Sequence, residues 1–188
     1  IGFSSIEQEI GNEYYYSDMV SKNFNTYHNK YSINDNDLSE NIDDVISCMS
    51  EPMVSQDSSA FYLLAKYVSQ KQKVVLSGQG ADELFGGYFW YKKIHDSKTH
   101  DLETFSNNYF DRNHDDFCNT ITKKFQGENF SYLLMKDLLS NYNDSLDLLD
   151  KILRIDLSML IVDDPVKRID NMTMAWGLET RVPYLDTD

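Results

Sequence analysis

The sequence predicts an α/β protein with a partial parallel sheet and helical crossovers, followed by a mostly helical second half. Up to Tyr91, apolar segments with helical periodicity alternate with strand-like segments, which is typical of parallel strands joined by helices. Beyond Tyr91 the apolar residues recur only at helical spacing. With 188 residues and no linker rich in Pro, Gly or Ser, we expect one domain, with an α/β part over residues 1–91 and a mainly helical part over residues 92–188.

The first half contains three helical patterns and two strand-like ones. In the clearest helix, Leu38, Ile42 and Val45 fall on one face, and Asp35 or Asn36 is the expected N-cap. The last strand is an apolar run that we expect to be buried. The expected elements are a helix over 12–24, a strand over 27–33, helices over 37–49 and 58–70, and a strand over 73–77.

The second half is predicted to be all-helical, with polar turns between the helices. In its last helix, Asp163 or Asp164 is the expected cap and Pro165 the expected first-turn residue. Apolar residues then recur at helical spacing as far as Trp176, which predicts a buried stripe. The expected helices cover residues 102–117, 132–139, 146–162 and 164–178.

Charge and cysteine content exclude several classes of function. The formal net charge is −14 without a basic patch, which opposes binding to nucleic acid or to an anionic membrane. No apolar run approaches the ~18 residues that span a bilayer. Cys48 and Cys118 lie far apart with no CxxC pattern, so we expect reduced thiols and a cytoplasmic protein, with a disulfide between them as the alternative. The histidines show no metal-ligand spacing.

The segment SGQGADELFGG, from Ser77 to Gly87, follows the last predicted strand of the first half. A parallel strand that enters a glycine-rich turn and then a helix presents backbone N–H groups and a positive helix end to a crevice, which favours anions. Gly78 and Gly80 would let the backbone approach a ligand closely, and Ser77 would add a hydroxyl donor. The turn therefore predicts an anion site.

Asp82 and Glu83 would repel a bare phosphate at such a site. A Mg²⁺ ion resolves the conflict, because it bridges carboxylate and phosphate oxygens and needs only one or two protein carboxylates. Adjacent carboxylates on a helix point about 100° apart, so we assign Asp82 to the metal, and Glu83 either to packing or to a contact with groups around the metal. The structural alternative is a capped helix that binds nothing, since GxGxxG and GK[ST] patterns are both absent.

Two long motifs resemble the synthetase domain of the glutamine-dependent asparagine synthetases. LSGQGADELFGGY is similar to that family's second signature, typically SGEGADELFGGY, and RIDNMTMAWGLETRVPYLD, residues 168–186, is similar to its RVDRMSMAHSLEARVPFLD pattern. SEPMVSQDSSAFYLLAKYVS, residues 50–69, and DDPVKRIDNMTMAW, residues 163–176, look most like the branch that makes N-acetylglutaminylglutamine amide. The resemblance covers almost the whole chain and is weakest over residues 92–149.

The resemblance implies an adenine nucleotide alpha hydrolase-like fold of the ATP pyrophosphatase type. In that family a substrate carboxylate attacks the α-phosphorus of Mg·ATP, giving an acyl-adenylate and pyrophosphate. Ammonia, released from glutamine by a separate glutaminase domain, then displaces AMP and forms an amide. By position in the motif, Ser77, Gly78 and Gly80 would contact the nucleotide and acyl-adenylate, and Asp82 would be a Mg²⁺ ligand.

Gln79 departs from the family pattern, since many asparagine-forming members have glutamate there. A glutamine amide cannot act as a general base at neutral pH, so Gln79 is expected to contact substrate. This favours a peptide-like carboxylate such as N-acetylglutaminylglutamine over aspartate. Arg168 and Asp170 are candidates for shaping the substrate pocket, with Lys167 or Arg168 offsetting phosphate charge. The alternative for these residues is a solvated polar face.

The family's ATP loop SGGxDS, its amidohydrolase cysteine and a lysine downstream of RVPYLD have no match in the sequence. We therefore expect an excised piece of one synthetase domain that makes no amide alone. Truncation would expose sheet edges and favour self-association, for which a homodimer is the simplest assembly. A non-catalytic binding domain of the same fold is the alternative. A hydrolase with Ser77 as nucleophile is disfavoured, because neither motif contains His and GxSxG is absent.

Overall fold

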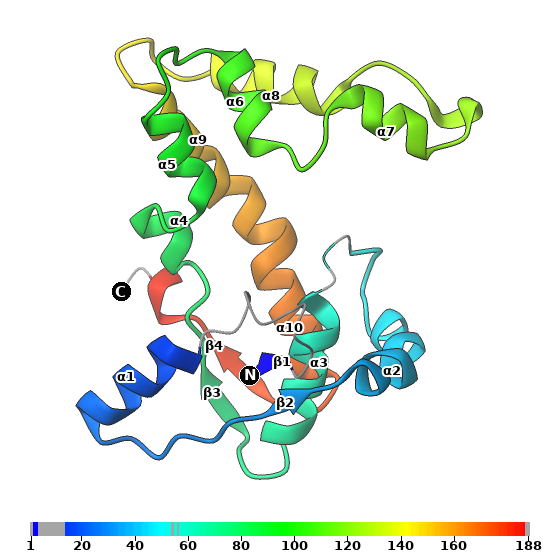
Figure 1. Cartoon of the computed structure of the whole chain (residues 1–188), viewed down its shortest axis with the longest axis vertical. Coiled ribbons are helices and arrows are strands. Elements are labelled where there is room, and N and C mark those ends of the chain that lie inside the picture. Colours follow the sequence, from blue (N-terminus) through cyan, green and yellow to red (C-terminus); the bar gives the residue numbers. More distant parts are fainter. Residues whose placement is uncertain (1, 4–13, 54, 56, 187–188) are drawn as a thin grey trace. The chain divides into compact units, whose positions relative to one another are not determined.

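The structure is a computed structural model that describes residues 2–3, 14–53, 55 and 57–186. It is mixed α/β and mostly helical, with two short parallel sheets (Figure 1). The described residues form two compact units, the first from those within 2–77 together with 164–186 and the second from 78–163. The boundary expected near residue 91 lies inside the second unit. The first unit is therefore assembled from two segments that are distant in sequence.

The first unit contains the helices predicted for the first half of the chain and the last helix of the second half. In the segment predicted as a strand over 27–33, only Ser32–Ile33 form a strand. Its elements are β1 (Gly2–Phe3), α1 (Tyr14–Phe24), β2 (Ser32–Ile33), α2 (Asp35–Ser47), α3 (Asp57–Val68), β3 (Val74–Leu76), α10 (Lys167–Met174), β4 (Glu179–Arg181) and the short 3₁₀ helix η5 (Pro183–Leu185).

The strands pair as two separate two-stranded parallel sheets, β1 with β2 and β3 with β4. Val75 of β3 lies opposite Thr180 of β4, a strand that the helical periodicity of the second half did not predict. The expectation that β3 is buried was wrong. Val74 is 47% and Leu76 is 73% exposed, because a sheet of two short strands covers little of either face.

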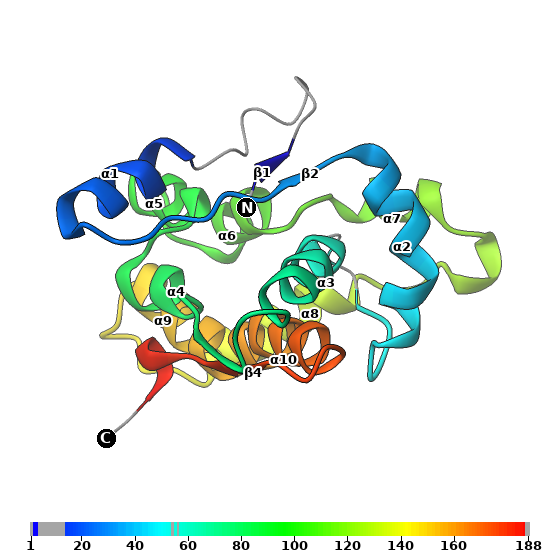
Figure 2. The same cartoon turned by 90° about the horizontal axis from the view of Figure 1, so that it is seen from below.

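The core of the first unit lies between α2, α3 and α10. Ile33, Val45, Tyr62, Leu63 and Met172 form it, and Figures 1 and 2 show α10 lying beside α3. The N-cap of α2 is neither Asp35 nor Asn36 but the residue before them. The Asn34 side chain accepts from the Asp37 N–H, and the Asp37 carboxylate accepts from the Asn34 N–H. This reciprocal capping box satisfies two backbone donors, which neither predicted cap does.

The second unit is helical and has its own core of Tyr91, Ile94, Phe105, Met135, Leu148, Ile152 and Ile155. Helix α5 was not predicted, and the helix expected over 102–117 is interrupted at residues 110–113. Its elements are α4 (Ala81–Phe85), α5 (Phe89–His95), α6 (Leu102–Tyr109), α7 (His114–Thr120), the 3₁₀ helix η2 (Lys123–Phe125), α8 (Phe130–Ser140), α9 (Leu148–Ile155) and the π-helical η3 (Asp156–Leu160).

The backbone stays helical from Leu148 through Met174, so the predicted helix start at Asp163 or Asp164 was wrong. Two π-helical segments lie within this run, η3 and η4 (Val162–Val166), and η4 contains Pro165. Proline has no N–H and clashes with the carbonyl four residues earlier in an α-helix. The wider π turn accommodates Pro165 without ending the helix.

Asp156 begins η3 and is completely buried. The Tyr91 hydroxyl donates to its Oδ2 at 2.5 Å, and the Tyr109 hydroxyl donates to its Oδ1. Burial raises the pKa of Asp156 to about 6. The two tyrosine hydrogen bonds oppose that shift, and the charge of Glu83 adds to it. Burial also raises the pKa of each tyrosine, so both hydroxyls keep their protons and act as donors.

No helix in the described ranges is long and apolar enough to cross a membrane. Cys48 and Cys118 are both free thiols, as predicted.

The apolar face of α1 provides a stability test. Phe24 is 76% exposed and no residue of α1 is buried, whereas Phe105 is 0% exposed. We expect Phe24→Ser to change the free energy of unfolding by less than about 0.5 kcal/mol. The matched change Phe105→Ala should cost about 3–5 kcal/mol. Urea unfolding followed by circular dichroism measures both. A large loss of unfolding free energy for Phe24→Ser would show that the apolar side chains of α1 are buried against other residues in solution.

The buried Asp156 makes a specific pH prediction. Its pKa is higher in the folded state than the usual ~4 of the unfolded chain, so its stabilising contribution is present below pH ~4 and is lost as the pH rises through ~6. The loss is about 3 kcal/mol. Between pH 4 and 7, Asp156→Asn should lack this component of the decline in unfolding free energy, while exposed Asp111→Asn should retain it. Equal pH slopes for wild type and Asp156→Asn would contradict the assignment.

Candidate functional site

The glycine-rich turn begins where β3 ends. The Ser77 N–H donates to the Arg181 carbonyl at 2.8 Å, which extends the pairing of β3 with β4 by one bond. A Cβ built on Gly78 would meet no atom within 4 Å, so its backbone is open to a ligand. Gly80 is buried and has φ of 92°, a left-handed conformation that glycine adopts without steric cost. Gln79 between them is half-buried.

Helix α4 follows Gly80 directly and contains five residues. A macrodipole is the sum of aligned peptide dipoles, so a helix of little more than one turn contributes little of it. The positive helix end expected from the sequence is therefore a minor feature. The open backbone at Gly78 and the carboxylate of Asp82 remain as the groups that face solvent at this turn.

The two adjacent carboxylates have opposite environments. Asp82 is exposed, and its carboxylate lies against Gly87. Glu83 is only 1% exposed, and its Oε1 accepts a 2.7 Å hydrogen bond from the Tyr88 hydroxyl. Glu83 therefore anchors α4 to the second unit, and Asp82 is the carboxylate that a ligand can reach.

The donor set at this turn suits only one kind of metal site. Within the described ranges, no three His, Cys, Asp or Glu side chains gather closely enough to hold a metal by themselves. Mg²⁺, however, usually takes one or two carboxylates and completes its shell with substrate phosphates and water. A single exposed Asp82 fits an ion that arrives with a nucleotide, and does not fit a permanent metal centre.

Arg168 and Asp170 lie in different environments. Arg168 is 8% exposed, and its Nη1 contacts Asp164 Oδ2 at 3.1 Å and Asp57 Oδ2 at 3.7 Å. Its guanidinium also lies over the Phe61 ring, 5.6 Å from the centroid. Asp170 is exposed instead. The buried Arg168 joins α10 to α3 and to the segment before α10, so its first role is structural.

The neighbouring residues of α10 contact the chain before α3. Lys167 Nζ pairs with Glu51, and the Ser50 N–H donates to Asn171 Oδ1 at 2.9 Å. Lys167 and Arg168 therefore already face carboxylates within the first unit. A phosphate would have to compete with these carboxylates for either cation.

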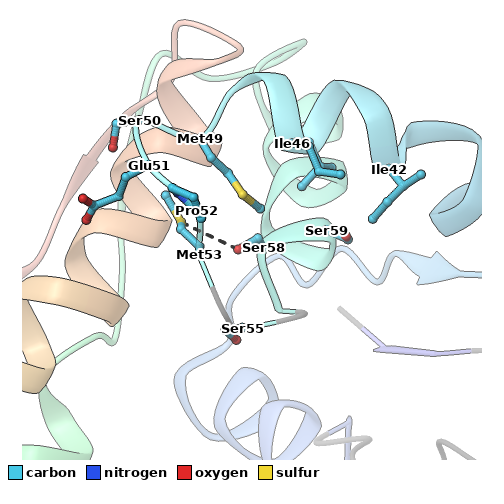
Figure 3. A pocket seen from close by; sticks show the side chains of 11 residues that line it. Ile42, Ile46, Met49, Ser50, Glu51, Pro52, Met53, Ser55, Ser58 and Ser59 are labelled. Atoms are coloured by element: carbon cyan, nitrogen blue, oxygen red, sulfur yellow. Dashed lines mark hydrogen bonds between the residues drawn. The ribbon is translucent and has the colours of Figure 1, made fainter. Parts of the chain in front are cut away.

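A cavity of about 630 Å³ lies between α2, α3 and the segment that joins them. Figure 3 shows Ile42, Ile46 and Met49 along its α2 side, with Glu51 on the side away from Ile42. Ser58 on α3 donates to the Met53 sulfur at 3.9 Å across the cavity. No sequence motif pointed to this site. Its one signal was the apolar stripe of α2, whose Ile42 and Ile46 are left 45% and 56% exposed.

The ion pairs of the buried Arg168 predict a stability effect. Arg168→Ala removes the cation that Asp57 and Asp164 share and its contact with Phe61, so we expect a loss of about 2–4 kcal/mol in the free energy of unfolding. Arg181→Ala is the matched control, because Arg181 is exposed and lies 3.9 Å from Glu179; it should cost less than about 1 kcal/mol. Denaturant titration separates the two. Equal small losses would assign Arg168 to the solvated surface.

The sequence pattern of the asparagine synthase family matches residues 1–188. The chain is 26% identical to asparagine synthetase [glutamine-hydrolyzing] 1 of Bacillus subtilis over 72% of its own length and 27% of that protein. It is 32% identical to asparagine synthetase [glutamine-hydrolyzing] 1 of Arabidopsis thaliana over 90% of its length and 21% of that protein.

No solved structure matches the chain. The chain spans about a quarter of the length of the curated relatives it matches, with 27% of a second Bacillus subtilis synthetase covered as well. The family match nevertheless extends over the entire chain and includes both sequence motifs. The chain therefore belongs to the asparagine synthase family.

Proposed function

We propose that this chain is the carboxylate-activating part of an ATP-dependent, glutamine-hydrolysing amidotransferase, with a fold of the ATP pyrophosphatase type. The observation that carries the proposal is the turn after β3. There an open glycine backbone is followed by one exposed carboxylate, Asp82, and one buried carboxylate, Glu83. Membership of a family whose relatives are named as glutamine-hydrolysing synthetases supports this choice among nucleotide-binding functions.

In the proposed reaction the substrate carboxylate attacks the α-phosphorus of ATP, and pyrophosphate leaves. Ammonia from glutamine then attacks the acyl carbon, and AMP leaves with the bonding electron pair. Ser77, Gly78 and Gly80 would lie against the nucleotide, where the absence of side chains at the glycines admits it. Asp82 would hold Mg²⁺, which neutralises phosphate charge when bound.

Gln79 is the proposed substrate contact. Its amide can donate and accept hydrogen bonds but cannot remove a proton, so ammonia must lose its proton to another group. The Gln79 amide suits a substrate that carries amide groups of its own. Its N–H can donate to a substrate carbonyl, and its oxygen can accept from a substrate N–H. We therefore propose a peptide-like carboxylate, of the N-acetylglutaminylglutamine kind, in preference to aspartate.

For the substrate pocket, the environments of Arg168 and Asp170 suggest different roles. Asp170 is exposed and is the member that can contact a substrate directly. Arg168 is buried in ion pairs and would act by holding α10 against α3. A direct contact from Arg168 would require its pairing with Asp164 to change.

The test is glutamine- and Mg²⁺-dependent release of AMP and pyrophosphate by the full-length protein, with aspartate or N-acetylglutaminylglutamine as acceptor. We expect release with the peptide-like acceptor, and a loss on the order of 100-fold for Asp82→Ala, because the carboxylate proposed to hold Mg²⁺ at the phosphates is removed. Asp111→Ala, an exposed carboxylate of the same unit, should retain full activity.

Release with aspartate alone would reject the peptide-like substrate and keep the ligase. If the protein binds ATP but releases no AMP or pyrophosphate with either acceptor, the alternative is favoured, a non-catalytic ligand-binding domain of the same fold. Unchanged activity in Asp82→Ala would reject the metal role of Asp82.

A further inference from the structure

Gly86 and Gly87 follow α4 as a pair, but the structure gives them different reasons to be glycine. Gly86 has φ of 66° and open space around its Cα, so only its backbone conformation requires glycine. Gly87 is not in the left-handed region. A Cβ built on Gly87 would lie 2.1 Å from Asp82 Oδ1 and 3.0 Å from Asp82 Cγ. The Asp82 carboxylate therefore occupies the space that a side chain at position 87 would need.

We propose that Gly87 is a positioning residue for Asp82, and that the bare Cα of Gly87 is the surface on which the Asp82 carboxylate rests. This inference rests on the proposed function, in which that carboxylate holds Mg²⁺. It assigns to Gly87 a part in setting the direction of the metal-binding oxygens, separate from the role of Gly86 in ending the helix.

Two contacts hold the backbone on both sides of this carboxylate. The Gly87 N–H donates to the Asp82 carbonyl at 2.9 Å, which joins the two residues directly. Their neighbours are joined as well, because the Tyr88 hydroxyl donates to the buried Glu83 carboxylate at 2.7 Å. Residues 82–88 are thus linked by two hydrogen bonds, one between backbone groups and one between side chains.

A methyl group at position 87 would therefore displace the carboxylate more readily than the backbone. The carboxylate is the end of a side chain and can rotate, whereas moving the backbone would break the bond to Glu83 or the bond to the Asp82 carbonyl. The Asp82 Cα lies 3.2 Å from the added Cβ, a distance that a shift of a few tenths of an ångström relieves. Gly87→Ala should consequently redirect Asp82 while the fold persists.

A double-mutant cycle on this chain tests the steric coupling. Gly87→Ala should lower Tm more in the presence of Asp82 than in Asp82→Ala, by about 2–4 °C. Gly86→Ala is the control: its cost comes from backbone strain, so it should be equal in both backgrounds. In the ¹³C-labelled chain, the Asp82 carboxyl resonance should move in Gly87→Ala and stay in Gly86→Ala.

An equal Tm cost of Gly87→Ala in both backgrounds, or an unmoved Asp82 resonance, would overturn the inference. The cycle remains informative if Gly87→Ala fails to fold. Folding restored by Asp82→Ala would support the steric contact, and failure in both backgrounds would reject it.

The Mg²⁺ dependence of the full-length protein separates this inference from the proposed function. If both hold, Gly87→Ala raises the Mg²⁺ concentration for half-maximal pyrophosphate release about 10-fold. Saturating Mg²⁺ should then recover most of the rate, which a general loss of folded protein would not allow. Coupling in the cycle without any change in Mg²⁺ dependence would keep Gly87 as the support of Asp82 and reject the metal role of Asp82.

Discussion

The parallel pairing of β3 with β4 is the constraint on which the arrangement of the first unit depends. Val75 and Thr180 lie opposite each other although about a hundred residues separate them in sequence, and the Ser77 N–H extends the ladder to the Arg181 carbonyl. Parallel strands require a long crossover, and here the second unit lies within that connection. The pairing brings the start of the glycine turn beside the segment that follows α10, so both sequence motifs meet at one short sheet.

Buried carboxylates organise the second unit in a similar way. Glu83 and Asp156 are both almost fully buried, and each accepts tyrosine hydrogen bonds. A buried carboxylate without partners would be strongly destabilising, so Tyr88 and Tyr91 are as necessary as the acids themselves. The hydrogen bond to Glu83 fixes α4, and those to Asp156 fix η3. They leave Asp82 as the exposed acid at the turn, the residue proposed to hold Mg²⁺.

The first unit contains a buried charge of the opposite sign, which also needs partners. Arg168 is buried between α10 and α3, where two aspartates and the Phe61 ring surround it. Such an arrangement stabilises the contact between helices only while the partners stay in place. The sequence suggested Arg168 as a partner for phosphate, but in the fold its guanidinium is already paired with two aspartates. The cavity beside α2 lies in the same unit but is lined mainly by apolar side chains.

Periodicity by itself determined the helices α1, α2 and α3 and the strand β3, because their local patterns agree with their final state. The glycine turn and the assignment of Asp82 and Glu83 to opposite environments also followed from local geometry. Tertiary structure decided the rest. The three residues of β4 carry no strand pattern and become a strand only through β3, and Pro165 continues a helix that its sequence context predicted to begin there. Three features depend on contacts between segments that the fold brings together: the burial of Arg168, the exposure of Leu76 and the overlap of Asp82 with a Cβ at Gly87. A local sequence pattern contains no information about the distances between such segments.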